Sequence, residues 1–258
     1  MSGDDPSRPA GDPIAAARKL TQRELPKRFY DLAEIIEQDG LFHLRLDGRP
    51  ALSPSRNRLA VTERALAEAM RAEWQAQGER IDPAAMPVTR LVNTALDGMQ
   101  GNEDAIRADI VAYAGSDLLC YRAGEPQGLV DRQRALWDPV LAWVEQLLDV
   151  RFRLAEGVVH VAQPREIRIA VKLKLATYSD PFRLTGLSMA TSLTGSALLA
   201  LAVAEGFVTP DDGWRAAHVD EDWNIAQWGE DTEAVARRAD RHRDFTAAMV
   251  ALGRSKAP

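Results

Sequence analysis

The spacing of apolar and polar positions changes near residue 60 of this chain. Between residues 28 and 53, the stretch Leu41–Asp47 alternates apolar and polar side chains, which is the period of a strand with one buried face. The dipeptides Asp39-Gly40 and Asp47-Gly48 tolerate positive φ and separate short strands in a meander. This segment therefore predicts a small antiparallel sheet.

After that point the apolar residues recur at helical spacing. Thr62 is expected to cap a first helix over residues 63–77. Gly195-Ser196 falls inside an apolar stretch, where its small side chains would let a second helix approach closely. The further elements predicted from the pattern are helices over residues 88–99, 103–114, 129–148, 165–178, 181–205, 210–225 and 230–252, a short element over 117–121 and a strand over 152–161.

The order of these elements predicts an α+β fold in three parts. Residues 1–26 are expected to form a mobile N-terminal arm, residues 27–88 a sheet-containing domain, and residues 89–258 a mostly helical domain. Within the helices, Trp74, Trp137 and Trp143 share helical spacing with neighbouring apolar residues. We therefore expect these three indoles to pack in the core.

The first 25 residues carry no recognisable targeting signal. They are polar, lack the apolar stretch of a secretory signal, and contain Asp4, Asp5 and Asp12, which a mitochondrial transit peptide avoids. We expect the protein to stay in the compartment where it is made. That compartment is the cytoplasm for a bacterial protein, or the mitochondrial matrix for a eukaryotic one.

Composition narrows the possible partners. Of the 258 residues, 46% are hydrophobic and 27% are charged, which is ordinary for a soluble globular protein, and no apolar run is long enough to insert into a membrane. The net charge of −6 argues against nucleic acid as the main partner. The single cysteine, Cys120, lies in an apolar run and is predicted to be a core thiol.

The usual motifs of catalysis and cofactor binding are missing from the sequence. No two of the four histidines have the i, i+4 spacing of a zinc site, and there is no Cys-x-x-Cys pair. Neither a phosphate-binding loop nor a Gly-x-Ser-x-Gly elbow occurs. We therefore assign no catalytic, cofactor-binding or metal-binding residue, and we expect the protein neither to bind nor to hydrolyse ATP.

One dense polar cluster extends over residues 220–231. It contains three consecutive acidic residues, Asp220, Glu221 and Asp222, and two tryptophans, Trp223 and Trp228. Carboxylates can perform acid-base chemistry, but consecutive helical residues point in different directions and do not face one substrate together. Two other readings remain open, which are a solvated helix end and a protein-binding hot spot.

Several ordered segments of the chain resemble the ATP12 family of assembly chaperones, from about Lys27 to the C-terminus. Asn224 and Ala226 depart from the residues usual in that family. The segments that carry the resemblance are Leu46-Asp47-Gly48-Arg49-Pro50 with Pro54 and Arg56-Asn57, Glu73-Trp74-Gln75-Ala76-Gln77-Gly78 with Ile81-Asp82-Pro83, Met86-Pro87 with Thr89-Arg90-Leu91, Asp117-Leu118-Leu119-Cys120-Tyr121-Arg122, Gln133 with Trp137-Asp138-Pro139, Gly195-Ser196, and the run from Asp220 to Gly229.

The resemblance implies a monomeric, non-enzymatic chaperone without a cofactor. Its client would be the unassembled α subunit of F1 ATP synthase, whose interface with the β subunit it would shield until exchange. The match places Glu221 in the acidic part of a motif that ends at Trp228-Gly229. Because no catalytic or metal partner explains why carboxylates and tryptophans gather there, we predict that Glu221, with Asp220, Trp223 and Trp228, contacts the client. The competing structural interpretation is that the tryptophans lock two helices together and that Glu221 pairs with an arginine such as Arg215 or Arg237.

Two alternative functions stay open from the sequence. The first is an enzyme, with or without a divalent metal, that uses the carboxylates of residues 220–231. The second is a subunit that remains in the finished complex. Stoichiometry separates the second from a chaperone, because a chaperone is absent from the assembled ATPase.

Overall fold

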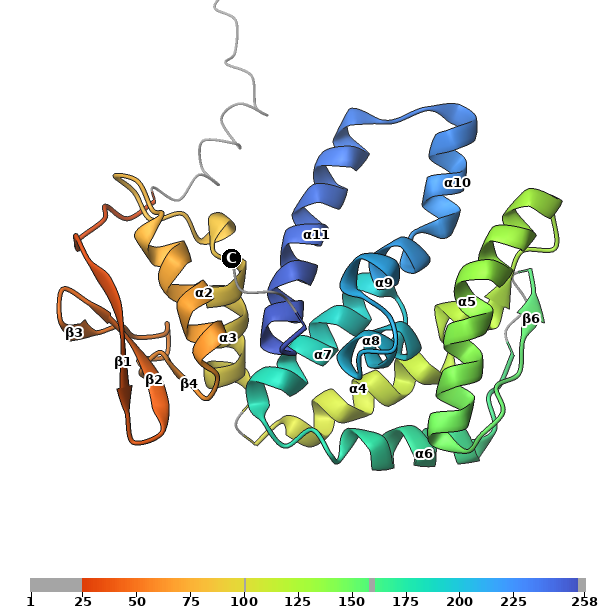
Figure 1. Cartoon of the computed structure of the whole chain (residues 1–258), viewed down its shortest axis with the longest axis horizontal. Coiled ribbons are helices and arrows are strands. Elements are labelled where there is room, and N and C mark those ends of the chain that lie inside the picture. The colour runs from red at the N-terminus through yellow and green to blue at the C-terminus, as the bar shows by residue number, and fades with distance from the viewer. Residues whose placement is uncertain (1–24, 100, 158–160, 255–258) are drawn as a thin grey trace, which may run out of the picture.

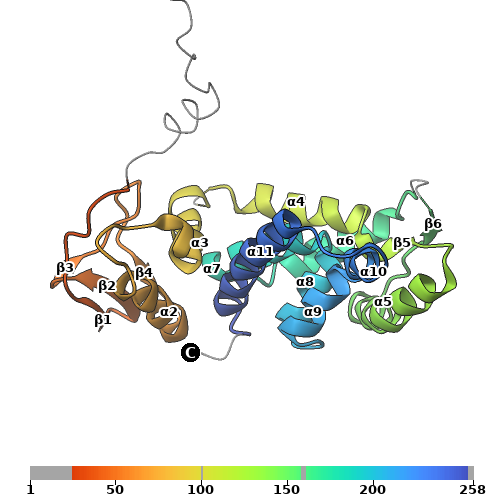
Figure 2. The ribbon, with the colours of Figure 1, turned by 90° about the horizontal axis from the view of Figure 1, so that it is seen from above.

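The computed structural model describes residues 25–99, 101–157 and 161–254 (Figure 1). Most of the arm predicted over residues 1–26 lies outside the described residues, as do residues 158–160 of the predicted strand. The sheet and helix α2 lie at one end of the molecule and α5 lies at the other (Figure 2). The observed order, a small antiparallel sheet followed by helices, confirms the α+β class.

The sheet is a meander built around two hairpin turns. Strand β1 (Ala33–Gln38) pairs antiparallel with β2 (Leu41–Leu46), and β2 also pairs with β3 (Arg49–Pro50) and β4 (Ala60–Val61). Asp39-Gly40 has φ values of 55° and 75°, and Asp47-Gly48 has 48° and 75°. Positive φ at both central residues matches the right-handed twist of the strands, as the sequence predicted.

Helix α2 (Arg64–Gln75) covers the sheet, but Thr62 does not cap it. The helix starts after Glu63, whose side chain makes no capping hydrogen bond. The hydroxyl of Thr62 instead donates to Asp180 Oδ2 at 2.8 Å. The capping prediction was wrong because the helix begins one residue later than expected, so that Glu63 and not Thr62 occupies the N-cap position.

The helical part follows in one continuous succession. Its elements are η1 (Pro83–Ala85), α3 (Pro87–Gly98), α4 (Glu103–Gly115), η2 (Leu118–Cys120), β5 (Tyr121–Arg122), α5 (Gln127–Leu148), β6 (Ala155–Glu156), α6 (Arg165–Leu175), α7 (Pro181–Thr194), α8 (Ala197–Ala204), α9 (Pro210–Ala217), α10 (Val219–Trp228) and α11 (Thr232–Ala251). Helix α5 passes through Pro139 as one helix. The strand predicted over 152–161 is reduced, within the described residues, to β6, which pairs in parallel with β5.

The helix predicted over residues 181–205 is two helices. Gly195, with a φ of 68°, ends α7 in the left-handed conformation, and the Ser196 hydroxyl accepts a hydrogen bond from Leu199 N at the start of α8. Gly195-Ser196 is therefore a helix break, not a site of close helix approach. The apolar pattern concealed the break because residues on both sides of it are buried.

The helix predicted over residues 210–225 is also divided. His218, with a φ of −115° and a ψ of 18°, separates α9 from α10. The break lets α10 leave the body of the molecule and form a hairpin with α11 (Figure 1). This change of direction creates the site described below.

The core of the helical part is organised around α8. Every residue of α8 is at most 1% exposed, and the helix packs against α4, α5, α7 and α9. Cys120 is fully buried beside it, and burial raises the pKa of its thiol to about 12, which confirms a core thiol. Trp137 is also fully buried, whereas Trp74 and Trp143 are only half-buried and pack at the margin of the core.

Candidate functional site

Helix α10 presents two different faces because of its helical periodicity. Asp220 and Trp223 lie on one side, and Glu221, Ile225 and Trp228 follow one another on the other side at spacings of four and three residues. Three acidic residues in the first turn complement the positive end of the helix dipole. The helix ends at Gly229, which has a φ of 88°.

The first face fastens α10 to α5. Asp220 Oδ1 accepts a hydrogen bond from Gln133 Nε2 at 2.7 Å, and Gln133 is itself buried. The indole of Trp223 lies against Gly128, where a β-carbon would come within 2.7 Å of its Cη2 atom. The Arg132 guanidinium lies 4.9 Å from the centre of the Trp223 ring. Asp220 and Trp223 therefore have structural contacts that explain their presence in the motif.

The second face lines an open cleft of about 670 Å³ between α10 and α11, which we call the hairpin cleft. Glu221 is half-buried in it, and Trp228 at its mouth is 86% exposed. Most of its wall is apolar, while Glu221, Glu230 and Asp231 supply acidic groups. The residues that line the hairpin cleft are Trp214, Glu221, Asn224, Ile225, Trp228, Gly229, Glu230, Asp231, Ala234, Val235, Arg238, Ala239 and His242.

Two contacts hold the hairpin in shape above the cleft. The Arg238 guanidinium of α11 pairs with Asp222 of α10 at 2.5 Å. At the tip, Asp231 caps α11 by accepting hydrogen bonds from Ala234 N and Glu233 N, and these bonds lower the pKa of its carboxyl group. The ion pair thus links α10 to α11, and the cap fixes the start of α11.

An aromatic cluster forms the floor of the cleft. The Trp214 ring lies 4.0 Å from His218, 5.0 Å from His242 and 5.1 Å from Phe245, measured between ring centres. His218 Nδ1 donates to the carbonyl oxygen of Trp214 at 2.8 Å. Burial lowers the pKa of His218, so its neutral form is favoured beneath the cleft.

The expected ion-pair partners of Glu221 are engaged elsewhere. Arg215 pairs with Asp212 at 2.5 Å, and Arg237 pairs with Glu233 at 2.6 Å. Within the part of the chain that the structure describes, Glu221 has no carboxylate–cation contact of its own. The alternative that assigned Glu221 to Arg215 or Arg237 is therefore wrong.

The three consecutive carboxylates do not converge on one point. Asp220 binds Gln133 on α5, Asp222 binds Arg238 on α11, and Glu221 lines the hairpin cleft. Among the described residues, no group of three or more His, Cys, Asp or Glu side chains is arranged to hold a metal ion. The three carboxylates thus contact three different surroundings and do not share one ligand.

Sequence reasoning missed the contribution of α11 to the cleft. Val235, Arg238 and His242 recur at spacings of three and four residues along its otherwise polar N-terminal half, and Ala234 lies next to Val235. That spacing is a detectable signal of a helix face. The position of α10 opposite this face was not predicted, because the break between α9 and α10 was not recognised in the sequence.

Comparisons with known proteins agree with the resemblance noted above. A model of the ATP12 chaperone protein family matches residues 27–145. The chain is 48% identical to the Atu1473 protein of Agrobacterium tumefaciens, described as a candidate chaperone, over 97% of this chain and 93% of that one, with a TM-score of 0.85. It is 34% identical to Atp12 from Paracoccus denitrificans over 90% of this chain and 99% of that one, with a TM-score of 0.81.

No helix of the described residues is both long and apolar enough to cross a bilayer.

Proposed function

Because this chain belongs to the ATP12 family of chaperone proteins, we propose that it binds the unassembled α subunit of F1 ATP synthase and shields the surface that the β subunit later covers. An orphan subunit exposes an apolar interface that is prone to aggregation. A reversible cover for that interface needs an accessible apolar surface on the chaperone.

The observation that carries the proposal is the exposed tryptophan at the mouth of an apolar cleft. Trp228 is 86% exposed although it is large and apolar, and it lies beside Ile225 and Val235 in the wall of the hairpin cleft. Exposed aromatic side chains of this kind are frequent hot spots of protein interfaces. We assign client contact to Trp228 and Glu221.

In this proposal, Asp220 and Trp223 affect client binding indirectly, because they hold α10 in position. They hold the helix against α5 by the Gln133 hydrogen bond and the contact with Gly128. Their substitution is expected to weaken client binding by displacing the helix, not by removing a direct contact.

Release of the client requires no catalytic step in this proposal. In this proposal, the β subunit displaces the chaperone by competing for the same surface of the α subunit. We expect the chaperone to act as a monomer and without nucleotide.

The test is the aggregation of purified F1 α subunit, followed by light scattering with wild-type chaperone or with Glu221→Lys. We expect the variant to keep the wild-type melting temperature and to lose protection, because truncating or reversing a hot-spot contact costs about 2 kcal/mol or more, roughly thirtyfold in affinity. Glu233→Lys is the matched control, since Glu233 is 82% exposed on the same hairpin and lies outside the cleft.

The outcomes separate the alternatives. A Glu221→Lys protein that melts normally and still protects the α subunit would contradict the assignment of Glu221. Equal loss of protection in Glu233→Lys would indicate a general charge effect on the hairpin. Addition of excess β subunit to the wild-type complex should release α, and failure to do so would contradict the proposed shielding of the β interface.

A further inference from the structure

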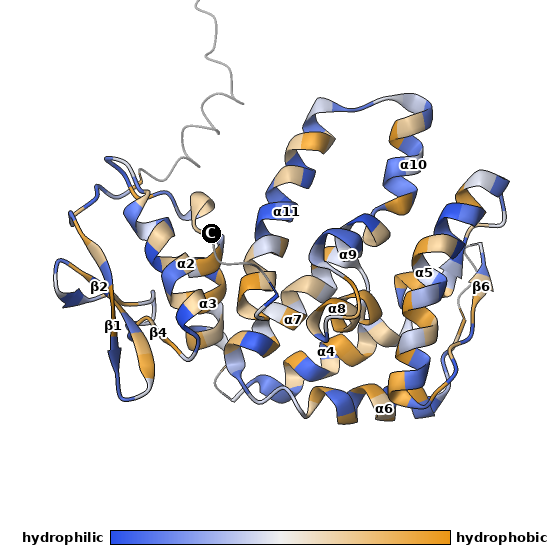
Figure 3. Ribbon diagram, in the orientation of Figure 1, coloured by the Kyte–Doolittle hydropathy of each residue, from blue (hydrophilic) through white to orange (hydrophobic). Residues whose placement is uncertain are grey.

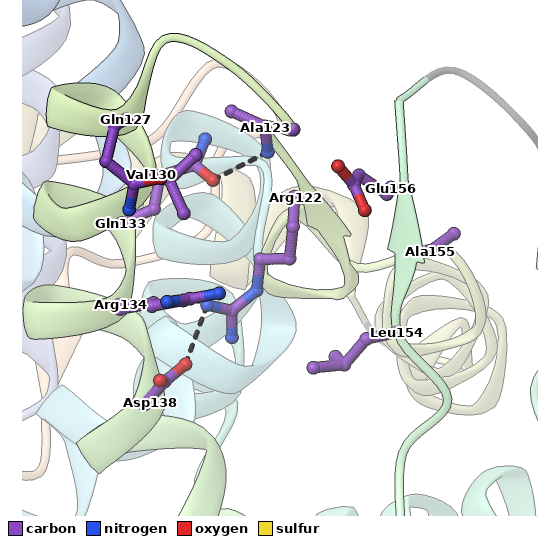
Figure 4. A pocket seen from close by; sticks show the side chains of 11 residues that line it. Arg122, Ala123, Gln127, Val130, Gln133, Arg134, Asp138, Leu154, Ala155 and Glu156 are labelled. Atoms are coloured by element: carbon purple, nitrogen blue, oxygen red, sulfur yellow. Dashed lines mark hydrogen bonds and ion pairs between the residues drawn. The ribbon is translucent and has the colours of Figure 1, made fainter.

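A second pocket lies between β5, β6 and the first half of α5, the helix to which α10 is also fastened (Figure 4). Its volume is about 350 Å³, which is enough for one side chain and part of its backbone. Two of the segments that carry the family resemblance, residues 117–122 and 133–139, meet at this pocket. The proposed client contact at the hairpin cleft leaves this pocket without a role.

Arg122 forms one wall and is held in a fixed orientation. Its side chain is only 13% exposed, its Nε donates to the carbonyl of Leu119 at 2.8 Å, and its Nη1 pairs with Asp138 at 2.7 Å. The guanidinium also lies 5.2 Å from the centre of the Trp137 ring. Its Nη2 is buried and has no hydrogen-bond partner. One donor of a preoriented cation that lines the pocket is therefore unsatisfied.

Arg134 of α5 adds a second guanidinium to the pocket. Figure 4 shows its side chain directed into the pocket, on the same side as Arg122 and Asp138. Within the described residues Arg134 has neither an ion pair nor a hydrogen bond of its own. Since Asp138 is already paired with Arg122, the positive charge of Arg134 is left uncompensated at close range.

The opposite wall is partly acidic and partly apolar. The Glu156 carboxylate lies over Gly124, so closely that a β-carbon at Gly124 would come within 2.1 Å of Glu156 Oε1. Leu154 is 48% exposed beside it, and Val130 lines the pocket from α5. The pocket thus combines a cationic side, an acceptor on the far side and aliphatic surface between them.

The charges that line the pocket favour a singly charged anion over a doubly charged one. Asp138 and Glu156 also line the pocket, so a dianion such as phosphate would be repelled more strongly than a ligand with a single negative charge. A carboxylate carries a single charge and matches the planar fork of a guanidinium. Glu156 is placed to accept a hydrogen bond from a backbone N–H next to that carboxylate, and Leu154 offers contact to methylene groups.

We propose that this pocket binds an acidic side chain, Asp or Glu, presented by an extended segment of a protein partner. The ligand carboxylate lies against Arg134, with the Arg122 guanidinium beside it, and its aliphatic part packs on Leu154 and Val130. Glu156 holds the neighbouring backbone N–H of the partner. The site is separate from the hairpin cleft, and its test requires no F1 subunit.

The binding measurement is a ¹⁵N NMR titration of the full chain with N-acetyl-glutamate α-methylamide. We expect saturable shifts at the amides of Ala123, Gly124 and Gln127, with a dissociation constant on the order of millimolar, which is the scale of one charge-assisted contact. N-acetyl-glutamine α-methylamide, of the same size without the charge, should bind at least about tenfold more weakly.

The matched variants are Arg134→Gln and Arg243→Gln. Arg134→Gln should weaken the glutamate probe about tenfold or more, since it removes the uncompensated cation. Arg243→Gln should leave the titration unchanged, because Arg243 pairs with Asp240 on α11, away from the pocket. Thermal melts of both variants check that each is folded, and Arg134→Lys provides a second cationic form if Arg134→Gln melts early.

Four results would overturn the proposal. They are equal affinity for the glutamate and glutamine probes, wild-type affinity in Arg134→Gln, shifts confined to residues outside the pocket, and tighter binding of inorganic phosphate than of the glutamate probe. Sodium acetate as a further probe separates a free small anion from a protein segment. Acetate that binds as tightly as the glutamate probe would show that the aliphatic wall and Glu156 contribute nothing.

Discussion

Helices α8 and α10 have similar lengths and opposite environments. All eight residues of α8 are at most 1% exposed, whereas Val219 is the only buried residue of α10. Figure 3 shows α8 hydrophobic along its length, while the hairpin of α10 and α11 mixes hydrophilic and hydrophobic positions. The molecule therefore concentrates the burial that stabilises the fold in one region and leaves apolar surface accessible in the other.

The carboxylates of the two regions show the same contrast. Asp117, the N-cap of η2, is fully buried and accepts hydrogen bonds from the Ser196 hydroxyl and from the backbone amides of Leu119 and Leu198. Glu221 on α10 lines an open cleft and belongs to no such network. A carboxylate inside the protein must be hydrogen-bonded or paired, because its burial is otherwise costly. A carboxylate at an open cleft is solvated by water and remains available to bind a group of another molecule.

The largest effect on stability is expected at Trp137 in the α8 region. Its indole is fully buried, and its Nε1 donates to the carbonyl of Ala216 at 2.7 Å. Trp137→Ala should lower the free energy of unfolding by about 3–5 kcal/mol, because it leaves a cavity and an unpaired carbonyl. Urea denaturation followed by circular dichroism measures this change, with the half-buried Trp143→Ala as a milder comparison. A loss below 1 kcal/mol would contradict the central role of this packing.

The second-largest effect expected is a loss of folding stability as the pH rises, caused by the titration of Asp117. Burial raises the pKa of this carboxyl group from 3.8 to about 6. The folded state thus keeps a proton that the unfolded state has released, so this contribution to stability is complete below pH ~4 and is lost as the pH rises through about 6. Relative to Asp117→Asn, which does not titrate, the wild-type protein should lose about 3 kcal/mol between pH ~4 and pH ~7.

This difference is measured by denaturant unfolding of both proteins across that pH range. Comparison with Asp117→Asn cancels the other titrating groups, because both proteins share them. A stability difference that does not change with pH would show that Asp117 carries the same charge in the folded and unfolded states.

A smaller effect is expected from a glycine beneath α8. A β-carbon at Gly213 of α9 would come within 2.4 Å of Val203 Cγ2, whereas nothing lies within 4 Å of one at Gly98. Gly213→Ala should cost about 1–3 kcal/mol through overpacking, and Gly98→Ala should be neutral or slightly stabilising. Equal thermal melts of the two variants would show that the α8–α9 contact relaxes without cost.

The smallest effect on stability is expected at Trp228 in the hairpin. Because this residue is 86% exposed, Trp228→Ala should change the free energy of unfolding by less than about 0.5 kcal/mol. The same variant should weaken binding of the F1 α subunit roughly thirtyfold under our proposal. Calorimetric binding together with a thermal melt separates the two effects. Substantial destabilisation by Trp228→Ala would show that Trp228, like Trp223, stabilises the fold.

The sequence by itself determined the α+β class and most of the helices. It also indicated both hairpin turns of the sheet, the buried cysteine and the resemblance to a family of chaperones. These features follow from local signals, because alternation, helical periodicity and Asp-Gly turns act over a few residues. The acidic and tryptophan-rich motif of residues 220–231 was likewise visible as a cluster.

Only the tertiary structure decided which side chains of that motif face which neighbours. Asp220 and Trp223 turn to α5, while Glu221 and Trp228 turn to α11. The helix breaks at Gly195 and His218 also required the structure, because apolar residues continue across both of them and conceal the end of a helix. Local periodicity assigns a residue to a face, but the partner of that face is set by packing between segments that are distant in the sequence.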